Sequence, residues 1–330
     1  MIEDKLLQPM TVHELMEKAG NNEHIVNAFA KAWDILGRYQ RPACSLSAGF
    51  DSDVMLDLIW RLDEDKKVRY VWFNDGFEYK ATREHLTFLE NKYGIQIEKV
   101  NPVKPIPQCV KEKGQPFVSK HVSMFMQGLQ RYGFDWKDEP YEVQLEKYPE
   151  CPSYIRWWHN KNKTRAHNIM YNRFLREFLI AYPPTYKISE QCCKYAKKKP
   201  AAKYYRRENI DLTLVGIRKQ EGGIRALINN CFTERESEPS IFRPIFWFTD
   251  ADKKVYQGLF NIELSDCYTK YGLSRTGCVG CPYNMNVFED LEKVAPYEPG
   301  LVKVANILFK DSYEHTKLYK QFRKDHGWNY

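Results

Sequence analysis

The chain has 330 residues, 28% of them charged, and a net charge of +7, so it is long enough for one large hydrophobic core or two smaller ones. No apolar run reaches the length of a membrane span and the first ten residues lack the apolar core of a signal peptide, so the sequence predicts a cytoplasmic protein. The excess of basic residues favours anionic partners such as nucleotides or nucleic acid. Nine cysteines in a cytoplasmic chain favour metal or redox chemistry over disulfides.

The first hundred residues alternate between helical and strand patterns. Apolar residues recur at helical spacing in two segments of 11–38, and a short apolar run at 43–46 is followed by a turn and another helical pattern. A strand-like run at 68–75, a helical pattern at 81–93 and the strand-like IQIEKV come next. Such alternation predicts an α/β fold with a parallel sheet, which binds ligands at the carboxyl ends of its strands.

The rest of the chain is less regular. Residues 133–165 are rich in charge, proline and aromatic residues, which is typical of an insertion or a long loop. We expect the following elements after it: a helix at 168–181, a strand at 212–218, an apolar run at 241–248, a helix at 250–260, and C-terminal helices whose inward faces carry Leu291, Val294, Leu301, Val304, Ile307 and Leu308. One continuous α/β domain with helical additions is the simplest organisation.

A turn with small residues, SLSAGFDSD (45–53), lies between the first strand-like run and its helix. Its alanine and glycine let a ligand approach the backbone closely, and Ser47, Asp51 and Ser52 lie where a helix start leaves N–H groups unpaired. Such a turn suits a phosphate, and the alternative is an ordinary capped helix start. It is not a Walker A loop, which needs Gly-Lys-Ser/Thr. The segment NDGFE (74–78) also follows a strand, so the two strand ends are predicted to share a crevice.

Two pairs of cysteines stand apart from the other five: Cys192-Cys193 and Cys278-Val279-Gly280-Cys281. A C-x-x-C turn places two thiolates on one ligand, and adjacent cysteines can serve neighbouring corners of a cluster. Four thiolates fit either tetrahedral zinc or a 4Fe-4S cube, although adjacent cysteines are unusual for structural zinc. The alternative is a C-x-x-C with an unrelated buried pair.

Six short segments, in order, match one family pattern. Ser47-Ala48-Gly49-Phe50-Asp51-Ser52 is similar to a Ser-Gly-Gly-x-Asp-Ser loop with alanine for the first glycine, and 84 residues lie between the two cysteine pairs. The other matching positions are Asp75, Gly76 and Thr82; Gly114, Pro116, Ser119 and Lys120; Lys197 and Pro200; Gly216, Arg218, Glu221 and Arg225; and the stretches PIFWFTDADKKVY and YGLSRTGCVGCP. The chain therefore resembles the iron-sulfur branch of the phosphoadenosine-phosphosulfate (PAPS) reductase family, within the PP-loop superfamily.

The resemblance implies an adenine nucleotide alpha-hydrolase-like fold, in which helices flank a parallel twisted sheet, with helical N- and C-terminal additions. The expected domains are N-terminal helices at 1–40, a PP-loop nucleotide-binding domain at 41–285 that carries the iron-sulfur site, and a C-terminal extension at 286–330. A 4Fe-4S cluster is expected on Cys192, Cys193, Cys278 and Cys281, with zinc as the alternative. ATP or another adenine nucleotide, with Mg²⁺, is expected at Ser47, Ala48, Gly49, Phe50, Asp51, Ser52, Asp75, Gly76, Lys120, Gly216, Arg218 and Arg225.

Three departures from the family pattern bear on the reaction. The family's sulfonucleotide reductases use a nucleophilic cysteine in a C-terminal Glu-Cys-Gly segment, and here no cysteine follows Cys281, which disfavours reduction of APS or PAPS. Phe50 replaces a lysine common in the loop, which removes one cation from the expected site. Ala196 replaces an arginine of the segment that follows the first cysteine pair.

The alternative within the superfamily is attack on the α-phosphorus of ATP, loss of pyrophosphate, and displacement of the adenylate by sulfur. The expected catalytic residues are Asp51, Lys197 and Arg218. Asp51 would hold Mg²⁺, and Arg218, Lys120 or Arg225 would neutralise phosphate charge.

Residues 154–173 interleave aromatic and basic side chains, among them Trp157, Trp158, Lys161 and Lys163, which suits stacking and phosphate contacts with single-stranded nucleic acid. The alternative is a solvated helix whose aromatic residues pack inward. Relatives that keep ATP and a cluster include thiolation enzymes of tRNA and DNA, so the resemblance favours an ATP-dependent sulfurtransferase acting on nucleic acid, with a sulfur donor such as a cysteine desulfurase. A non-catalytic or regulatory nucleotide-binding iron-sulfur accessory protein is the alternative of a different class.

Overall fold

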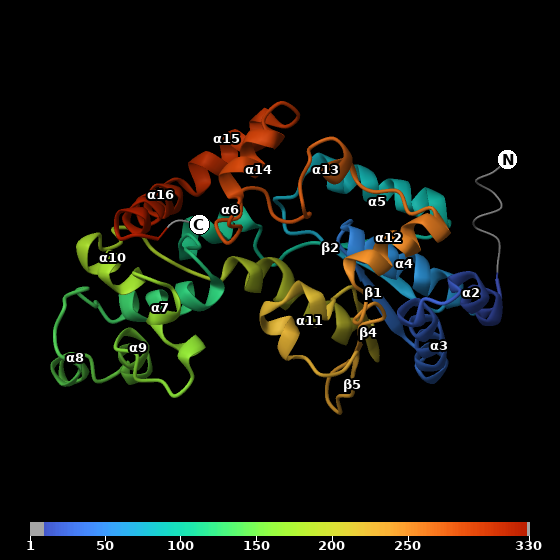
Figure 1. The fold of residues 1–330 in the computed structure, drawn as a ribbon, viewed down its shortest axis with the longest axis horizontal. Coiled ribbons are helices and arrows are strands. Elements are labelled where there is room, and N and C mark those ends of the chain that lie inside the picture. The colour runs from blue at the N-terminus through green and yellow to red at the C-terminus, as the bar shows by residue number, and fades with distance from the viewer. Residues whose placement is uncertain (1–9, 329–330) are drawn as a thin grey trace. The chain divides into compact units, whose positions relative to one another are not determined.

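The computed structural model describes residues 10–328, which form two compact units (Figure 1). The first unit contains the residues up to Val103 together with Lys197–Gly277, and the second contains Lys104–Ala196 together with the residues from Cys278 onward. The chain therefore passes between the units three times. The three domains expected from the sequence, with boundaries at residues 40 and 285, stay a prediction. They are continuous stretches of sequence, whereas each compact unit combines two separate stretches.

A six-stranded sheet forms the centre of the first unit, in the order β3-β2-β1-β4-β6-β5. Its strands are β1 Pro42–Leu46, β2 Arg69–Phe73, β3 Ile97–Val100, β4 Leu212–Val215, β5 Phe232–Thr233 and β6 Ser240–Phe242. Neighbouring strands are parallel, apart from β5, which pairs antiparallel with β6. The predicted α/β fold with a mainly parallel sheet is confirmed.

Several helices of the first unit begin at a side chain that caps their first turn. They are α2 Val12–Ala19, α3 Glu23–Arg38, α4 Phe50–Leu62, α5 Lys80–Tyr93, α11 Lys199–Arg207, α12 Asp250–Phe260 and α13 Asp266–Thr269, with 3-10 turns η4 Lys219–Glu221 and η5 Gly223–Leu227. Thr11, Asn22 and Thr249 accept backbone N–H groups at the starts of α2, α3 and α12. The helices predicted within 11–38 and at 81–93 and 250–260 are confirmed.

The two faces of the sheet pack against different helices. Cys44 on β1 and Tyr70 on β2 belong to a large core that also contains buried residues of α3, α4, α5 and α12. Their neighbours Ala43 and Val71 belong to a smaller core with Tyr204 of α11. Alternation with a period of two is what a sheet covered on both faces requires.

The second unit is helical. Its helices are α6 Ile106–Lys113, α7 Lys120–Arg131, α8 Tyr141–Lys147, α9 Pro152–Trp158, α10 Leu175–Ala181, α14 Val287–Val294, α15 Pro299–Leu308 and α16 Lys310–Asp325, with 3-10 turns η1 Arg165–His167 and η2 Ile169–Tyr171. The long loop expected over 133–165 is wrong, because α8 and α9 lie there and Trp136 and Ile155 are buried in the core of this unit. The helix expected at 168–181 is divided into η2 and α10, with Phe174 in the left-handed region (φ 59°) just before α10.

Trp157 and Trp158 lie inside this core and are fully buried. The Trp157 ring stacks on Phe125 at a centroid distance of 5.0 Å, and the edge of Trp158 meets Phe134 at 5.3 Å. The expectation that these two tryptophans stack on bases is wrong, because their rings already pack against aromatic neighbours. The alternative, in which the aromatic residues pack inward, is confirmed for the two tryptophans, whereas Tyr171 on η2 is 64% exposed.

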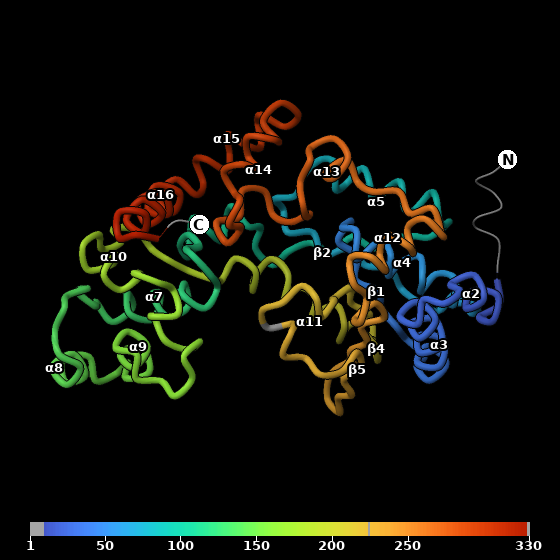
Figure 2. The backbone as a smooth tube through the Cα atoms, in the orientation of Figure 1, coloured from blue at the N-terminus to red at the C-terminus, as the bar shows by residue number. Residues whose placement is uncertain are grey.

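The three C-terminal helices follow one another along the chain (Figure 2). Leu291 and Val294 on α14 are buried as predicted, but Val304 and Ile307 on α15 are 44% and 69% exposed. α15 carries apolar residues on more than one face, so helical spacing alone does not predict which face is buried. The residue of α15 that is buried is Ala305. In residues 10–328, no helix has both the length and the apolar character needed to cross a membrane.

A buried carboxylate on α4 joins three helices of the large core. Asp57 is fully buried and accepts hydrogen bonds from the Arg61 guanidinium at 2.8 and 3.0 Å. It also accepts from the hydroxyl of Tyr93 at the end of α5 (3.1 Å) and from that of Tyr256 on α12 (2.7 Å). Because all four groups lie away from water, removal of the carboxylate leaves a buried cation and two hydroxyls without their acceptor.

Asp57→Ala should therefore lower the free energy of unfolding by about 3–5 kcal/mol, measured by urea denaturation. The matched control is Asp34→Ala, which breaks the ion pair of Asp34 with Arg38 on α3, where both side chains are at least half exposed. That control should cost less than about 1 kcal/mol. Equal small losses in the two variants would contradict a central role for the Asp57 network.

Candidate nucleotide site and cysteine group

The turn between β1 and α4 requires small residues. Ala48 has a φ of 52°, in the left-handed region that glycine adopts most easily, which agrees with the glycine of the loop that this turn resembles. At Gly49, a Cβ atom would lie 2.8 Å from Thr276 Oγ1 and 3.3 Å from Tyr268 Oη. The turn therefore has no space for a side chain at position 49.

Hydrogen bonds hold the turn in place. Ser47 N donates to Ser52 Oγ (3.0 Å), which ties the end of β1 to the first turn of α4. Phe50 N donates to Tyr268 Oη (3.1 Å). The side chain of Ser47 is exposed and Ser52 is buried, so the first is placed to meet a ligand and the second to shape the turn.

Strand order places this turn at a topological switch point of the sheet. The chain adds β2 and β3 on one side of β1, and then adds β4 on the other side. In parallel α/β sheets, ligands bind just beyond the carboxyl ends of the strands at such a point. Gly216, directly after β4, approaches the turn closely, since a Cβ atom there would lie 3.0 Å from the carbonyl oxygen of Asp51.

Asp51 contacts two cations from later parts of the chain. Its Oδ1 lies 3.0 Å from Arg218 Nε and 2.7 Å from Lys253 Nζ. Arg218 also lies 2.9 Å from Asp250 Oδ1 and donates to the carbonyl oxygen of Phe248 (3.3 Å). Because Arg218 and Lys253 are buried, water screens their charges less than it screens surface charges.

Lys253 is a site residue that sequence reasoning missed. It lies within the matched stretch PIFWFTDADKKVY, one turn into α12, and that helix packs on α4. Its ammonium group lies 4.5 Å from the centroid of the Phe50 ring. Position 50 is commonly a lysine in the loop that this turn resembles, and it is a phenylalanine in this chain. Lys253 thus supplies a cation beside that position.

Further positive charge surrounds Asp51. Burial and the charges of Arg275 and Arg218 lower the pKa of Arg225, while Asp51 opposes this shift. Arg225 forms an ion pair with Glu221 on η4. The first unit therefore gathers several cations around one carboxylate at the switch point, an arrangement suited to a polyphosphate group.

A second polar group lies at the end of β2, the strand next to β1. Lys197 Nζ lies 3.0 Å from Oδ2 of the fully buried Asp75, whose Oδ1 accepts from Phe77 N (2.8 Å). Asp75 N donates to the carboxyl group of Glu78, and Gly76 between them has a φ of 78°. Burial and the charge of Asp75 raise the pKa of Glu78 to about 7. Sequence reasoning placed Asp75 and Lys197 here but did not name Glu78.

The structure assigns the predicted site residues to both units. The first unit contains Ser47, Ala48, Gly49, Phe50, Asp51, Ser52, Asp75, Gly76, Lys197, Gly216, Arg218 and Arg225. Lys120, the exposed first residue of α7, belongs to the second unit. The common site for Lys120 and the loop therefore stays a prediction.

All four cysteines expected to bind a cluster belong to the second unit. Cys192 is buried, whereas Cys193, Cys278 and Cys281 are partly exposed. A hydrogen bond with Cys193, burial, and the charges of Cys281 and Cys278 raise the pKa of Cys192, so the other three sulfur atoms lie within electrostatic range of that of Cys192. Among residues 10–328, no group of three or more His, Cys, Asp or Glu side chains is arranged to hold a metal ion.

The first cysteine pair begins an unusual helical segment. Residues 192–193 are helical and continue into a π-helical turn, η3 Lys194–Lys198, which leads directly into α11. π-helical turns contain one extra residue per turn and are frequent at functional sites. Here the π-helical turn carries Lys197, the partner of Asp75.

A mainly parallel α/β sheet, with a glycine-containing turn and buried cations at its switch point, is the architecture of the PP-loop nucleotide-binding fold. The family model described as phosphoadenosine phosphosulfate reductase domain matches residues 41–152 and 159–284, so the chain belongs to this family. The match covers most of the chain and extends over both units. A comparison with curated proteins finds no match.

Several solved structures are similar over most of this chain. They include the PAPS reductase of Candida auris in a phosphate complex (12% identity, 82% of this chain and 98% of that chain, TM-score 0.43). They also include the FMN adenylyltransferase of Candida glabrata with FMN and the ATP analogue AMPCPP (10%, 84% and 73%, 0.40), and the NH3-dependent NAD synthetase of Campylobacter jejuni (12%, 93% and 97%, 0.35). Because these TM-scores are below 0.5, the assignment to the family depends on the family model.

Glu78→Gln should change how stability depends on pH. The pKa of Glu78 is raised from 4.5 to about 7 in the folded chain, so its contribution to stability is fully present below pH 4.5 and is lost as the pH rises through 7. Between pH 5 and 8, the free energy of unfolding of the wild-type protein should fall by on the order of 2–3 kcal/mol more than that of Glu78→Gln. Urea denaturation across this range measures the difference.

The control for this experiment is Glu84→Gln, because Glu84 lies on the exposed surface of α5 in an ion pair with Lys80. Its profile should run parallel to that of the wild-type protein. Parallel profiles for Glu78→Gln and the wild-type protein would show that Glu78 does not hold a proton near neutral pH.

Proposed function

We propose that this protein is an ATP pyrophosphatase of the PP-loop class that adenylates an acceptor for sulfur transfer. The observation that carries the proposal is the contact of Asp51 with both Arg218 and Lys253 at the first turn of α4. The carboxylate holds the two cations beside the loop, where they can neutralise the β- and γ-phosphates of a bound nucleotide. Arg225 and Arg275 add charge for the same group.

The reaction follows from this placement of charge. An oxygen atom of the acceptor attacks the α-phosphorus, the bond from that phosphorus to the bridging oxygen breaks, and pyrophosphate leaves with the negative charge that the cations neutralise. The terminal sulfur of a persulfide, R–S–S⁻, then attacks the adenylated position, AMP leaves, and the acceptor is held as a disulfide, R–S–S–acceptor. A second thiol, acting as the two-electron reductant, attacks the sulfur of R, so that the thiolated acceptor is released and a disulfide between R and that thiol remains. A cysteine desulfurase is the class of protein that would supply the sulfur.

Magnesium is a further expectation for this site, with Asp51 as its ligand. The residues present do not form such a site by themselves, because the Oδ1 atom of Asp51 already contacts two cations. The role that we propose for Asp51 is therefore to position Arg218 and Lys253, and no step of the reaction above depends on a metal ion.

The acceptor that we propose is a nucleic acid bound through its phosphates. Base stacking on Trp157 and Trp158 is excluded by their burial. The cations nearby remain available, since Lys161, Lys163 and Arg165 are exposed around the end of α9 and at η1. This part of the proposal therefore depends on charge and not on aromatic contacts.

Lys253→Met should reduce pyrophosphate release from ATP by a hundredfold or more. The variant lacks a buried cation that would stabilise the negative charge that develops on the leaving pyrophosphate. Asp51→Asn should have a similar effect by releasing both cations. Lys254→Met is the matched control, since Lys254 is the exposed neighbour on the same helix and should retain full activity. Release should be measured with and without tRNA or single-stranded DNA as the acceptor.

Two outcomes of this assay would contradict the proposal. Wild-type protein that binds ATP but releases no pyrophosphate with either nucleic acid would favour a non-catalytic accessory protein. Formation of sulfite from PAPS by the same preparation would instead indicate a sulfonucleotide reductase.

A 4Fe-4S cluster on Cys192, Cys193, Cys278 and Cys281 is the second part of the proposal. Four cysteines are the donor set that such a cluster takes, with one cysteine on each iron, and here three of them lie within electrostatic range of Cys192. When bound, the cluster would supply either electron transfer or a site for sulfur. The four cysteines would be its ligands, and their thiols would lose their protons on binding iron.

Anaerobically purified protein should contain about four irons per chain and absorb broadly near 400 nm. Cys192→Ser and Cys278→Ser should lose the iron, whereas Cys231→Ser should keep it, because Cys231 belongs to the other unit. Iron content and the visible spectrum measure this result. Colourless protein with one zinc ion per chain would contradict the cluster and favour a structural metal site.

A further inference from the structure

An exposed tryptophan lies close to the residues of the candidate nucleotide site. Trp247 is 46% exposed, although its two neighbours in the chain, Phe246 and Phe248, are buried in the large core of the first unit. A single exposed apolar side chain is common on protein surfaces and does not by itself indicate a site. The contacts and charges around the ring therefore decide what Trp247 can do.

Hydrogen bonds hold the backbone on both sides of Trp247 against the segment that follows β4. Lys219 N donates to the carbonyl oxygen of Phe246 (2.9 Å), and Arg218 Nη1 donates to that of Phe248 (3.3 Å). The same arginine contacts the carboxylate of the candidate nucleotide loop at 3.0 Å. Trp247 therefore lies near that site, on a backbone that these hydrogen bonds keep in place.

The ring of Trp247 has two side-chain contacts. The Phe246 ring meets it edge to face at a centroid distance of 4.9 Å, and Lys219 Nζ lies 4.9 Å from its centroid. The indole ring thus presents a flat apolar surface with a cation beside it. A nucleotide of a single strand matches both features, since its base stacks on an aromatic ring and its phosphate pairs with a cation.

The charges around this ring favour an anionic partner. Of the carboxylates nearby, Glu221 is paired with Arg225 and Asp250 with Arg218. Lys219 contacts the indole ring and takes part in no ion pair among residues 10–328. Its charge can therefore pair with a phosphate without breaking an ion pair of the fold.

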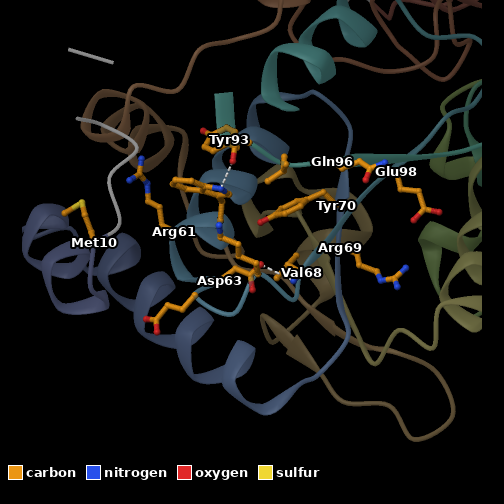
Figure 3. A pocket seen from close by; sticks show the side chains of 14 residues that line it. Met10, Arg61, Asp63, Val68, Arg69, Tyr70, Tyr93, Gln96 and Glu98 are labelled. Atoms are coloured by element: carbon orange, nitrogen blue, oxygen red, sulfur yellow. Dashed lines mark hydrogen bonds between the residues drawn. The ribbon is translucent and has the colours of Figure 1, made fainter. Parts of the chain in front are cut away.

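Two other tryptophans of the first unit have exposed surface in different surroundings. Trp33 on α3 is 51% exposed, but the hollow beside it is lined by four carboxylates and two basic side chains. Trp60 lies in the wall of a cavity of about 680 Å³, whose lining carries both signs of charge, such as Glu98 and Arg69 (Figure 3). Neither surrounding favours a polyanion. Trp33 therefore provides a control of similar exposure in acidic surroundings.

We propose that Trp247 and Lys219 bind one nucleotide of a single-stranded nucleic acid, with the base stacked on the indole ring and the phosphate paired with the ammonium group. This inference rests on the nucleic-acid acceptor of the proposed function and adds a contact with a base to the contacts with phosphates. An unpaired base is required, because the bases of a duplex stack on one another and leave no face for the ring. Every base has such a face, so the contact selects single strands and not a sequence.

The test compares two labelled strands of about 12 nucleotides that carry equal charge, oligothymidylate and a fully abasic strand. Fluorescence anisotropy at low salt, with the full chain as titrant, gives both affinities. Wild-type protein should bind oligothymidylate about tenfold more tightly than the abasic strand, as stacking of one base predicts. In Trp247→Ala this preference should disappear, whereas in the control Trp33→Ala it should stay unchanged.

Further variants separate stacking from packing and from charge. Trp247→Leu keeps an apolar side chain against Phe246 and should lose the preference as the alanine variant does, whereas Trp247→Tyr should keep most of it, because a phenol ring also stacks. Lys219→Met should weaken both strands alike and flatten the plot of log affinity against log salt by about 0.7. The tryptophan variants should leave that slope unchanged, because they remove no charge.

Failure of this inference can be distinguished from failure of the proposed function. An unchanged preference for oligothymidylate in both Trp247→Ala and Trp247→Leu would overturn the inference, even if nucleic acid stimulates pyrophosphate release. Loss of the preference in both variants would support it, even if the wild-type protein releases no pyrophosphate. Wild-type protein that binds neither strand would overturn the inference together with the nucleic-acid acceptor.

The adenine ring of a bound nucleotide is the competing partner of Trp247. In that case Trp247→Ala would bind the ATP analogue AMPCPP about tenfold more weakly in the absence of nucleic acid and would keep its preference for oligothymidylate. Under our proposal the affinity for AMPCPP stays unchanged, so this result would overturn it in favour of adenine.

Discussion

The buried carboxylate of Asp57 is the interaction on which the arrangement of the first unit depends. It lies in the middle of α4 and connects that helix to α5 through Tyr93 and to α12 through Tyr256. The same helix begins at Phe50 in the candidate nucleotide loop and ends at Leu62. A charge in the core is expensive to bury, so four hydrogen bonds to it fix the position of α4 more specifically than apolar packing would.

The candidate nucleotide site shows how a distant part of the chain can supply a cation that the loop itself lacks. The loop lacks the lysine common at position 50, but Lys253 on α12 brings its ammonium group over the Phe50 ring and onto Asp51. Lys253 lies three residues before Tyr256, whose hydroxyl donates to Asp57, so the helix that carries this cation is itself held on α4. Under the proposed function, binding of phosphate at this site would depend on the packing of α12 on α4.

The fold was largely predictable, because alternation of strand and helix patterns specifies a parallel sheet and its ligand-binding edge. The loop at 47–52 and the motif around Arg218 were also predictable, since short motifs fix their own local geometry. Lys253 was not, because its contact with Asp51 joins residues about two hundred positions apart and depends on how α12 packs.

Burial was the property that sequence patterns predicted least well. Trp157 and Trp158 lie among basic residues in the sequence, yet both are in the core of the second unit. Ile307 was expected on the inward face of a C-terminal helix because of its helical spacing, yet it is exposed. In both segments, apolar or aromatic side chains occur on several faces, so periodicity does not identify the buried one. Only the packing partners, such as Phe125 beside Trp157, decide it.

The π-helical turn at Lys194–Lys198 has a consequence for comparing this chain with its relatives. One extra residue within a turn rotates everything after it by about 100° relative to a regular α-helix. Consider a relative whose chain forms a regular α-helix in this segment. When its sequence is aligned without a gap, either the cysteine pair or the later part of α11 is in register, but not both. A one-residue gap between 194 and 198 restores the register of both. Where that gap falls decides whether Lys197 or a neighbour is counted as the equivalent lysine, so this segment should be aligned by its structure.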